Sequence, residues 1–258
     1  MRVISMLLLT VAAVLAPRRL DACASLPAVP VIYPRQEIVP TNSHFWVFAQ
    51  TEKIGQLFQR RVTIREEGAG IVPASRQDFQ SGNMHVTEMI PVASLKAHTL
   101  YVVTLEPDPG EQRSSIATFE TAAGPDVTAP LWEGISAVSV KRTSRKEAEN
   151  CNRCPDPNKP WIEIDLKRPT DDTTPEEEIL YAVWLPDKNG QVDESKPLTT
   201  YLRRLPLGHL VLGVRDICMN APEESGLQSF KGPFKAILRP VDWAGHMGPP
   251  HEVRAVLK

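Results

Sequence analysis

The sequence predicts an all-β protein, in which two antiparallel β-sandwiches follow an N-terminal signal peptide. Three observations lead to this fold class. Short runs of alternating apolar and polar residues dominate the chain, which is typical of half-buried strands. No amphipathic helical stretch is longer than two turns. Turn signals rich in glycine, proline, asparagine and aspartate separate the runs, and many short strands without intervening helices favour sandwiches.

The first 24 residues are organised like a secretory signal. Arg2 precedes an apolar run over residues 3–16, which is shorter than the roughly 20 residues that span a bilayer but fits a signal-peptide core. The small residues Ala22 and Ala24 flank Cys23, so we expect cleavage after Ala24. Residues 20–23 also resemble a bacterial lipobox, in which Cys23 would be acylated. Both alternatives predict export to the periplasm, the outer surface or the medium, free or lipid-anchored.

The charge of the mature chain argues against nucleic acid as a partner. Residues 1–24 contain three arginines and one aspartate, so their removal lowers the formal net charge from −2 to −4. Nucleic-acid binding would require a basic stripe. No later segment is apolar enough to cross a membrane, which leaves a lipid on Cys23 as the only predicted membrane contact. We therefore expect a protein or glycan partner at the cell envelope.

Three cysteines remain after processing: Cys151, Cys154 and Cys218. An oxidising compartment favours a disulfide, and three thiols permit one intrachain bond. We expect Cys218 to pair with Cys151 or Cys154, and the spacing does not choose between them. A zinc site would need these cysteines together with a histidine, for which the candidates are His209, His246 and His251. A redox role would need a thioredoxin-like context, which the sequence lacks.

The clearest predicted strand is Trp161–Leu166, because Ile162, Ile164 and Leu166 share one face. The other predicted strands cover residues 44–49, 61–65, 100–105, 116–121, 135–140, 179–185, 210–214, 234–241 and 253–257. Residues 145–159 are interpreted as a long polar loop pinned by cysteine. The three glutamates at 176–178 are interpreted as a solvated loop rather than a helical turn.

A domain boundary is predicted within residues 122–130. This stretch contains small residues, a glycine and two prolines between strand-like segments, which is linker composition. It divides the mature chain into a first sandwich over residues 25–124 and a second over residues 125–258.

Several motifs resemble bacterial Ig-like and fibronectin type III-like domains of surface proteins. Residues 95–101 (LKAHTLY) are similar to the L-x-P-x-T-x-Y segment, with Ala97 in place of the proline. In that segment the tyrosine, here Tyr101, forms a tyrosine corner by bonding back to the upstream backbone. Residues 39–48, 119–121 and 126–130 resemble the first strand, the closing strand and the linker of such modules.

The second half resembles the same domains less closely. Residues 171–184 are similar to a fibronectin-type strand entry. Residues 242–248 (DWAGHMG) are similar to the D-x-A-G-N-x-S turn of bacterial Ig-like modules, with His246 and Gly248 replacing asparagine and serine. The resemblance implies a non-enzymatic binding or structural role at the envelope without a cofactor, because these motifs specify a fold and not a reaction.

Two other functions were considered from the residues. Met84, His85 and Met89 offer the soft ligands of a copper site, which would make the chain a periplasmic metal-binding Ig-like protein. Four tryptophans of the second half could form a sugar-stacking surface of an accessory carbohydrate-binding module, namely Trp132, Trp161, Trp184 and Trp243. Surface and core packing is the preferred interpretation of both sets.

Calcium ligands were also considered at Asp171 and Asp172 and at Asp187 with Asp193. Solvated turns are the preferred interpretation of these aspartates. The chain carries no nucleophile elbow, phosphate loop or zinc-protease motif. We therefore predict neither catalytic nor metal-ligating residues.

Overall fold

The computed structural model describes residues 31–50, 62–81, 84–105, 114–142, 160–187, 190–204, 208–212 and 232–257. The signal peptide, the predicted loop at 145–159, and Cys23, Cys151, Cys154 and Cys218 lie outside these ranges. The predictions made for them therefore stay predictions, as do the domain boundaries.

The described chain is all-β, with strands paired almost entirely antiparallel, which confirms the predicted fold class. Its helical content is a 3-10 turn at Glu176–Glu178. Within the described ranges, no helix has the length and apolar character needed to cross a membrane.

Strands of the first half form two sheets, called I and II here. Sheet I contains, in spatial order, β2 (Ile38–Val39), β9 (Ser114–Thr121), β8 (Leu100–Leu105), β4 (Val62–Glu66) and β5 (Gly70–Val72). Sheet II contains β1 (Val31–Tyr33), β3 (Phe45–Gln50), β7 (Met84–Pro91) and β6 (Ala74–Ser81). The short β2–β9 pair is parallel, and the other pairs are antiparallel.

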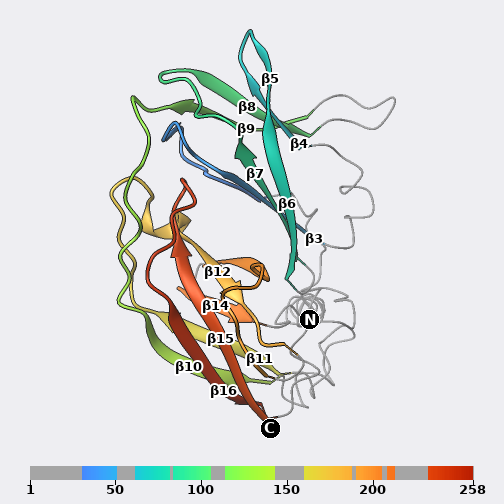
Figure 1. Cartoon of the computed structure of the whole chain (residues 1–258), viewed down its shortest axis with the longest axis vertical. Helices are drawn as coiled ribbons and strands as arrows, with labels where there is room; N and C mark the ends of the chain where they lie inside the picture. Colours follow the sequence, from blue (N-terminus) through green and yellow to red (C-terminus); the bar gives the residue numbers. More distant parts are fainter. Residues whose placement is uncertain are drawn as a thin grey trace, which may run out of the picture.

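Strands of the second half form sheets III and IV. Sheet III contains β13 (Thr200–Arg203), β12 (Leu180–Trp184), β15 (Gly232–Val241) and β16 (His251–Leu257). Sheet IV contains β10 (Ile135–Lys141), β11 (Trp161–Leu166) and β14 (His209–Leu212). Figure 1 shows the first-half sheets at one end of the long axis and the second-half sheets at the other.

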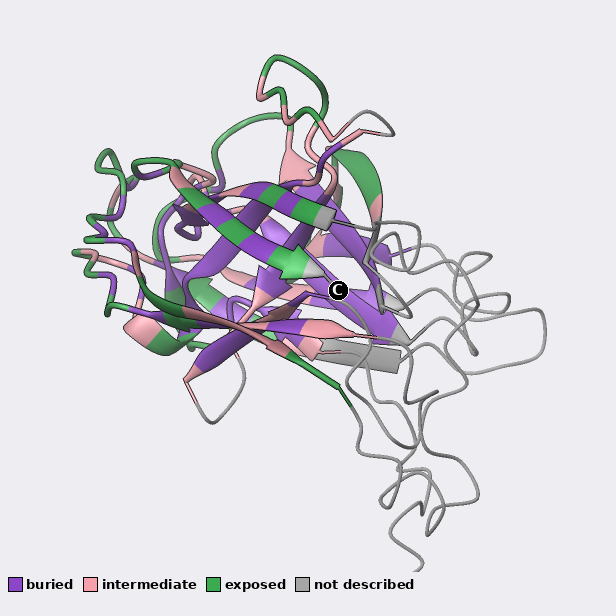
Figure 2. Ribbon diagram, turned by 90° about the horizontal axis from the view of Figure 1, so that it is seen from below, coloured by how far each residue is buried: buried purple, intermediate pink, exposed green. Residues whose placement is uncertain are grey.

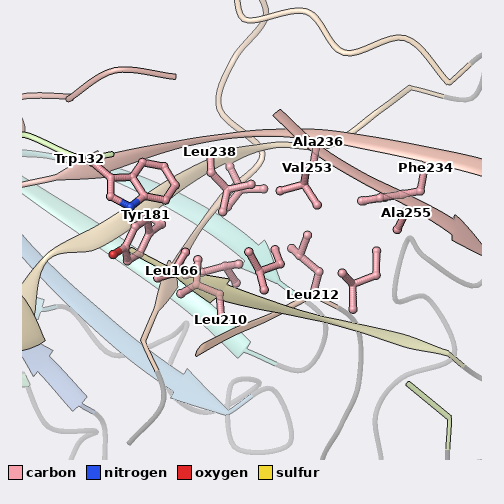
Figure 3. Close-up of a cluster of buried hydrophobic side chains, with 14 of the residues drawn as sticks. Trp132, Leu166, Tyr181, Leu210, Leu212, Phe234, Ala236, Leu238, Val253 and Ala255 are labelled. Carbon is pink, nitrogen blue, oxygen red and sulfur yellow. The ribbon is translucent and has the colours of Figure 1, made fainter. Parts of the chain in front are cut away.

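Each pair of sheets encloses a hydrophobic core. Between sheets I and II, Phe45 and Val47 of β3 meet Ile64 and Val103 of the opposite sheet. Between sheets III and IV, inward side chains of β11 and β14 meet those of β15 and β16 (Figure 3). On β16 buried and exposed residues alternate, as the sequence pattern predicts for a strand with one face in a core (Figure 2).

A third core joins the two sandwiches. Sheets II and III lie face to face, and their facing side chains form one cluster: Tyr33, Trp46, Phe48 and Val86 from sheet II, and Leu180, Ala182, Trp184, Tyr201 and Val241 from sheet III. The rings of Trp46 and Tyr201 form a T-shaped pair, with 5.7 Å between their centroids. The four sheets therefore stack in the order I, II, III, IV.

This stacking corrects the prediction that the strands near residues 44–49 and 179–185 are half-buried. Strand β12 is buried on both faces, with Tyr181 and Val183 in the second-half core and Leu180 and Ala182 in the shared core. Strand β3 is divided in the same way between two cores. A strand covered by a sheet on each side must be apolar at every position, so its sequence is a continuous apolar run instead of an alternating one.

The tyrosine corner predicted at Tyr101 is confirmed. Its ring is buried, and its hydroxyl accepts a 2.9 Å hydrogen bond from the backbone amide of Lys96. This hydrogen bond fixes the segment that leads into β8, a strand of sheet I, against the first-half core.

The glutamates at 176–178 form the 3-10 turn, so their interpretation as a solvated loop was wrong for Glu178. This side chain is 3% exposed and accepts a 2.7 Å hydrogen bond from the backbone amide of Arg35 in the first half. The turn thus carries a contact between the sandwiches. A buried carboxylate needs hydrogen-bond partners at fixed positions, so the turn that carries Glu178 is ordered.

Candidate functional site

Three loops meet where the two sandwiches join, and they bring together five side chains that could ligate a cation. Asp126 lies in the linker, Asp171 and Asp172 lie in the loop before the 3-10 turn, and Asp242 and His246 lie in the turn between β15 and β16. We call these five residues the joint cluster.

Asp126 is the centre of the joint cluster and is 3% exposed. Its backbone is held by Asn42 of the first half, whose side chain donates to the Asp126 carbonyl and accepts from the Asp126 amide, both at 2.9 Å. Its carboxylate accepts a hydrogen bond from the Thr128 amide at 2.9 Å and another from the Thr173 hydroxyl. The linker is therefore tied to both sandwiches.

The loop before the 3-10 turn is shaped by Asp171. One of its carboxylate oxygens accepts hydrogen bonds from the amides of Thr173 and Thr174, at 3.1 and 2.7 Å. The other oxygen, Oδ1, is buried and has no hydrogen-bond partner among the described residues. Asp172 accepts from the Thr128 hydroxyl. Such side-chain-to-backbone bonds stabilise tight loops.

The β15–β16 turn buries Asp242, which is 1% exposed. Its carboxylate accepts from the His246 amide at 2.9 Å and lies 3.0 Å from His246 Nδ1. Burial raises the pKa of Asp242 to about 6, and the negative charges of Asp126 and Asp171 act in the same direction. The electrostatic environment therefore disfavours a further negative charge at this point.

The donor set suits a hard divalent cation. Ligand atoms of Asp126, Asp242 and His246 lie within 4.8 Å of one another, and so do those of Asp126, Asp171 and Asp172. Carboxylate oxygens are the preferred ligands of Ca²⁺ and Mg²⁺. Such an ion would offset the repulsion between buried carboxylates.

A second polar contact crosses the shared core at Glu88 of β7. This carboxylate is 3% exposed. It accepts a 3.0 Å hydrogen bond from the Tyr201 hydroxyl of sheet III and lies 2.8 Å from His44 Nδ1. Tyr201 has a raised pKa, chiefly because it is buried, so it remains a hydrogen-bond donor at ordinary pH.

Trp243 connects the two halves through packing. It follows Asp242 in the second half, yet its ring belongs to the first-half core. Its amide donates to the Thr174 hydroxyl at 3.0 Å, and its carbonyl accepts from the His44 amide at 2.6 Å. Gly245, two residues after Trp243 in the same turn, has a positive φ of 82° and lies against the His44 ring.

Of the copper ligands considered from the sequence, the structure describes the side chains of His85 and Met89 and gives them different neighbours; the side chain of Met84 lies outside the described residues. His85 is buried beside Asp78, with 3.0 Å between Nε2 and the carboxylate. Met89 belongs to the first-half core. Along β7, Thr87 lies between these two residues on the same face, so they contact different neighbours.

The histidines considered for zinc have separate environments. His246 bonds Asp242, and the ring of His251 meets Trp132 with 4.7 Å between centroids. His209 lies in β14, opposite Asp165 of β11.

The sugar-stacking surface of four tryptophans is contradicted by burial. Trp132, Trp184 and Trp243 belong to three different cores, at 5%, 8% and 2% exposure. Trp161 alone of the four is half-buried at the surface of sheet IV, where its Nε1 donates to Glu163 at 3.1 Å. Three buried rings cannot stack on a ligand.

Of the calcium candidates, the structure brings Asp171 and Asp172 to Asp126. Asp187 and Asp193 instead form local turns, in which they accept hydrogen bonds from the amides of Gln191 and Ser195. The sequence motifs contained Asp126 and Asp242 only as linker and turn residues, and His246 as a turn residue and a candidate zinc ligand. Glu88, His44 and Tyr201 carried no sequence signal.

Comparisons with known proteins identify no family for this chain. No protein-family model matches it, and no curated protein matches it. Among solved structures it is similar to the N-terminal Ig1-2 module of the Drosophila receptor protein tyrosine phosphatase DLAR, at 14% identity and a TM-score of 0.28, over 86% of this chain and 96% of that one.

Two pullulanases are also among the similar structures. The enzyme from Anoxybacillus sp. LM18-11 matches at 10% identity and a TM-score of 0.26, over 83% of this chain. The type I enzyme from Bacillus subtilis str. 168 matches at 9% identity and a TM-score of 0.24, over 89% of this chain. The match spans about a quarter of each enzyme, 24% and 25%.

Proposed function

We propose that this chain is a non-enzymatic exported protein of the bacterial envelope or cell surface, in which two Ig-like sandwiches act as one rigid binding or structural unit. The observation that carries the proposal is the shared core between sheets II and III. Hydrogen bonds from Tyr201 to Glu88 and from Arg35 to Glu178 cross the same interface. Apolar burial combined with polar contacts fixes one relative orientation, since sliding would leave buried polar groups unpaired.

Rigidity is useful to an envelope protein because it holds surface loops at fixed positions for a partner. The tyrosine corner at Tyr101 and the turn at residues 242–248 support the Ig-like assignment of the two halves. Residues 1–24 support export, because they have the charge, apolar core and small residues of a signal peptide.

Residual dipolar couplings of the mature protein test the rigid unit. We expect one alignment tensor to fit amide vectors from both sandwiches. Two tensors of different magnitude would show independent motion and would contradict the proposal.

The mature N-terminus tests export. Mass spectrometry of the protein from an expressing bacterium is expected to find Ser25, or a lipidated Cys23, as the first residue. A chain that retains residues 1–24 in the cytoplasm would contradict this part of the proposal.

A second candidate function is metal binding, which the joint cluster favours. We expect Ca²⁺ to raise the thermal midpoint of the mature protein, because a divalent cation binding only the folded state stabilises it by mass action. Asp126→Asn should abolish this increase, whereas Asp165→Asn, a change at an exposed aspartate on β11, should preserve it. An unchanged midpoint in the unmodified protein would exclude this candidate.

A further inference from the structure

Strand β6 is the longest strand that ends a sheet in the described part of the chain, and it pairs with β7 on one side. Among the described strands, none pairs with its other side. Residues 75–78 are exposed. The ring of Phe79 forms a T-shaped contact with Tyr201 of sheet III, with 5.1 Å between centroids. This contact holds β6 in place while one of its edges faces outward.

The register of the β6–β7 pair shows which backbone groups point to the outward edge. Pro73 lies opposite Val92 in this register, and its carbonyl accepts a 2.9 Å hydrogen bond from the Val92 amide. Hydrogen-bonded and non-hydrogen-bonded pairs alternate along an antiparallel ladder. Residues 75, 77, 79 and 81 therefore bond β7, whereas the amides and carbonyls of residues 74, 76, 78 and 80 point away from it.

The outward edge carries one positive and one negative side chain, two positions apart. Arg76 and Asp78 lie on one face of β6, and Arg76 Nε donates to Asp78 Oδ2 at 2.9 Å. Among the described residues, this oxygen accepts from Arg76 alone. The contact uses Nε and Nη2 of the guanidinium, which has five N–H donors in all. Both groups can therefore form a second ion pair.

Two copies of β6 can pair antiparallel about a twofold axis, and the charges select one register. With the axis at Gln77, Arg76 of each copy lies opposite Asp78 of the other, and residue 74 lies opposite residue 80. With the axis at residue 76 or at residue 78, two like charges would be directly opposed. Opposite charges across an antiparallel pair stabilise it, and like charges destabilise it.

The backbone agrees with the register that the charges select. With the axis at Gln77, each outward-pointing residue meets another outward-pointing residue, so the amides and carbonyls of residues 74, 76, 78 and 80 bond each other across the axis. An axis between two residues would instead oppose outward-pointing and inward-pointing groups. Backbone and side chains therefore favour the same pairing.

Strand β16 shows that the charge spacing alone does not select an edge. It ends sheet III and carries the same spacing of opposite charges, at Glu252 and Arg254. Its outer side is covered, however, because β10 of sheet IV packs alongside it and the ring of Trp132 meets His251. Only β6 combines the paired charges with an uncovered edge among the described strands.

We propose that the protein forms a twofold-symmetric dimer through β6, in which sheet II of one copy continues into sheet II of the other. A twofold contact uses the same patch on both copies, so a self-complementary strand suits it. The dimer presents every surface loop twice, which increases the avidity for a repeated partner. This inference goes beyond the function proposed above. The rigid unit does not depend on the dimer, so either can fail alone.

The test is sedimentation velocity of the soluble mature protein that begins at Ser25, at concentrations from about 1 µM to about 500 µM. We expect the mean sedimentation coefficient to rise reversibly from the value of a monomer toward that of a dimer. A monomer at every concentration overturns the proposal. A dimer that persists in denaturing electrophoresis without reductant also overturns it, because a disulfide would then link the copies.

Two charge reversals make the test specific. Arg76→Asp leaves two negative charges on the edge, and Asp78→Arg leaves two positive charges, so each variant alone opposes like charges across the axis. We expect each dissociation constant to rise about tenfold or more. An equimolar mixture should restore the dimer as a heterodimer, because each edge then meets the opposite charge. A mixture of folded variants that stays monomeric overturns the proposal.

Arg76→Asp is decisive if Asp78→Arg does not fold. The Asp78 carboxylate also accepts from Thr87 at 2.7 Å, whereas the Arg76 side chain bonds Asp78 alone among the described residues. Arg254→Asp is the matched control, because it reverses the same charge in the equivalent pair on β16, and it should dimerise as the unmodified protein does. Equal effects of Arg76→Asp and Arg254→Asp, or no effect of Arg76→Asp, would overturn the proposal.

Discussion

Replacing Trp243 by alanine tests the packing between the two halves. The ring is 2% exposed and lies in the first-half core, although its position in the chain belongs to the second half. A buried tryptophan removes roughly 200 Å² from water, and about 25 cal/mol per Å² gives about 5 kcal/mol. Aromatic-to-alanine changes in cores cost about 3–5 kcal/mol. We expect a loss of this size in the free energy of unfolding.

The measurement is urea unfolding of the mature protein followed by circular dichroism. Trp161→Ala is the control, because Trp161 is half-buried at the surface of sheet IV and its loss should cost about 1 kcal/mol or less. A loss below about 1 kcal/mol for Trp243→Ala, similar to that of the control, would refute the reasoning that this ring completes the first-half core.

Three further predictions concern single sites. Tyr181→Phe should leave stability unchanged or raise it by about 1 kcal/mol in thermal unfolding, because the buried hydroxyl has no hydrogen-bond partner in the part of the chain that the structure describes; a clear loss would contradict this. Gly245→Ala should destabilise the protein by about 2 kcal/mol or more in the same assay, since φ is 82° and the new Cβ would lie 2.4 Å from His44 Cε1; tolerance of alanine would show that the His44 ring is not fixed there. Asp242 has a pKa of about 6 in the folded protein, above its usual value of 3.8. Because the folded state holds this proton more tightly than the unfolded state does, the protonated carboxyl contributes to stability fully below about pH 4, and this contribution is lost as pH rises through about 6. Asp242→Asn should flatten the decline in stability over this range in metal-free buffer, and an unchanged pH profile would disprove the assignment.

Local patterns predicted the strands that cover one face of a core. The bounds Trp161–Leu166 and Leu100–Leu105 agree with the structure, because each strand has alternating or uniformly β-favouring residues between turn signals. The strand Ala74–Ser81 was missed. It is largely polar and exposed at the edge of sheet II, so it lacks the apolar period by which a strand is recognised.

The stacking of the sandwiches has a signal in the sequence. The runs at β3 and β12 are apolar on both faces, which a sandwich with one solvent-facing side does not require. The candidate site had no comparable signal. Asp126, Asp171 and Asp242 come from three distant loops, and only the tertiary fold brings their carboxylates together.

The same limit applies to Glu88. Its buried carboxylate accepts a hydrogen bond from Tyr201, which is 113 positions away in the sequence. On the sequence alone it is one polar residue in a strand, where exposure to solvent is the usual arrangement.

Differential scanning calorimetry of the mature protein tests the central claim most directly, which is that the two sandwiches form one unit through the core between sheets II and III. The account predicts a single transition whose calorimetric and van't Hoff enthalpies agree, because the halves cannot separate without exposing the shared core. Two resolved transitions, one for each sandwich, would contradict it.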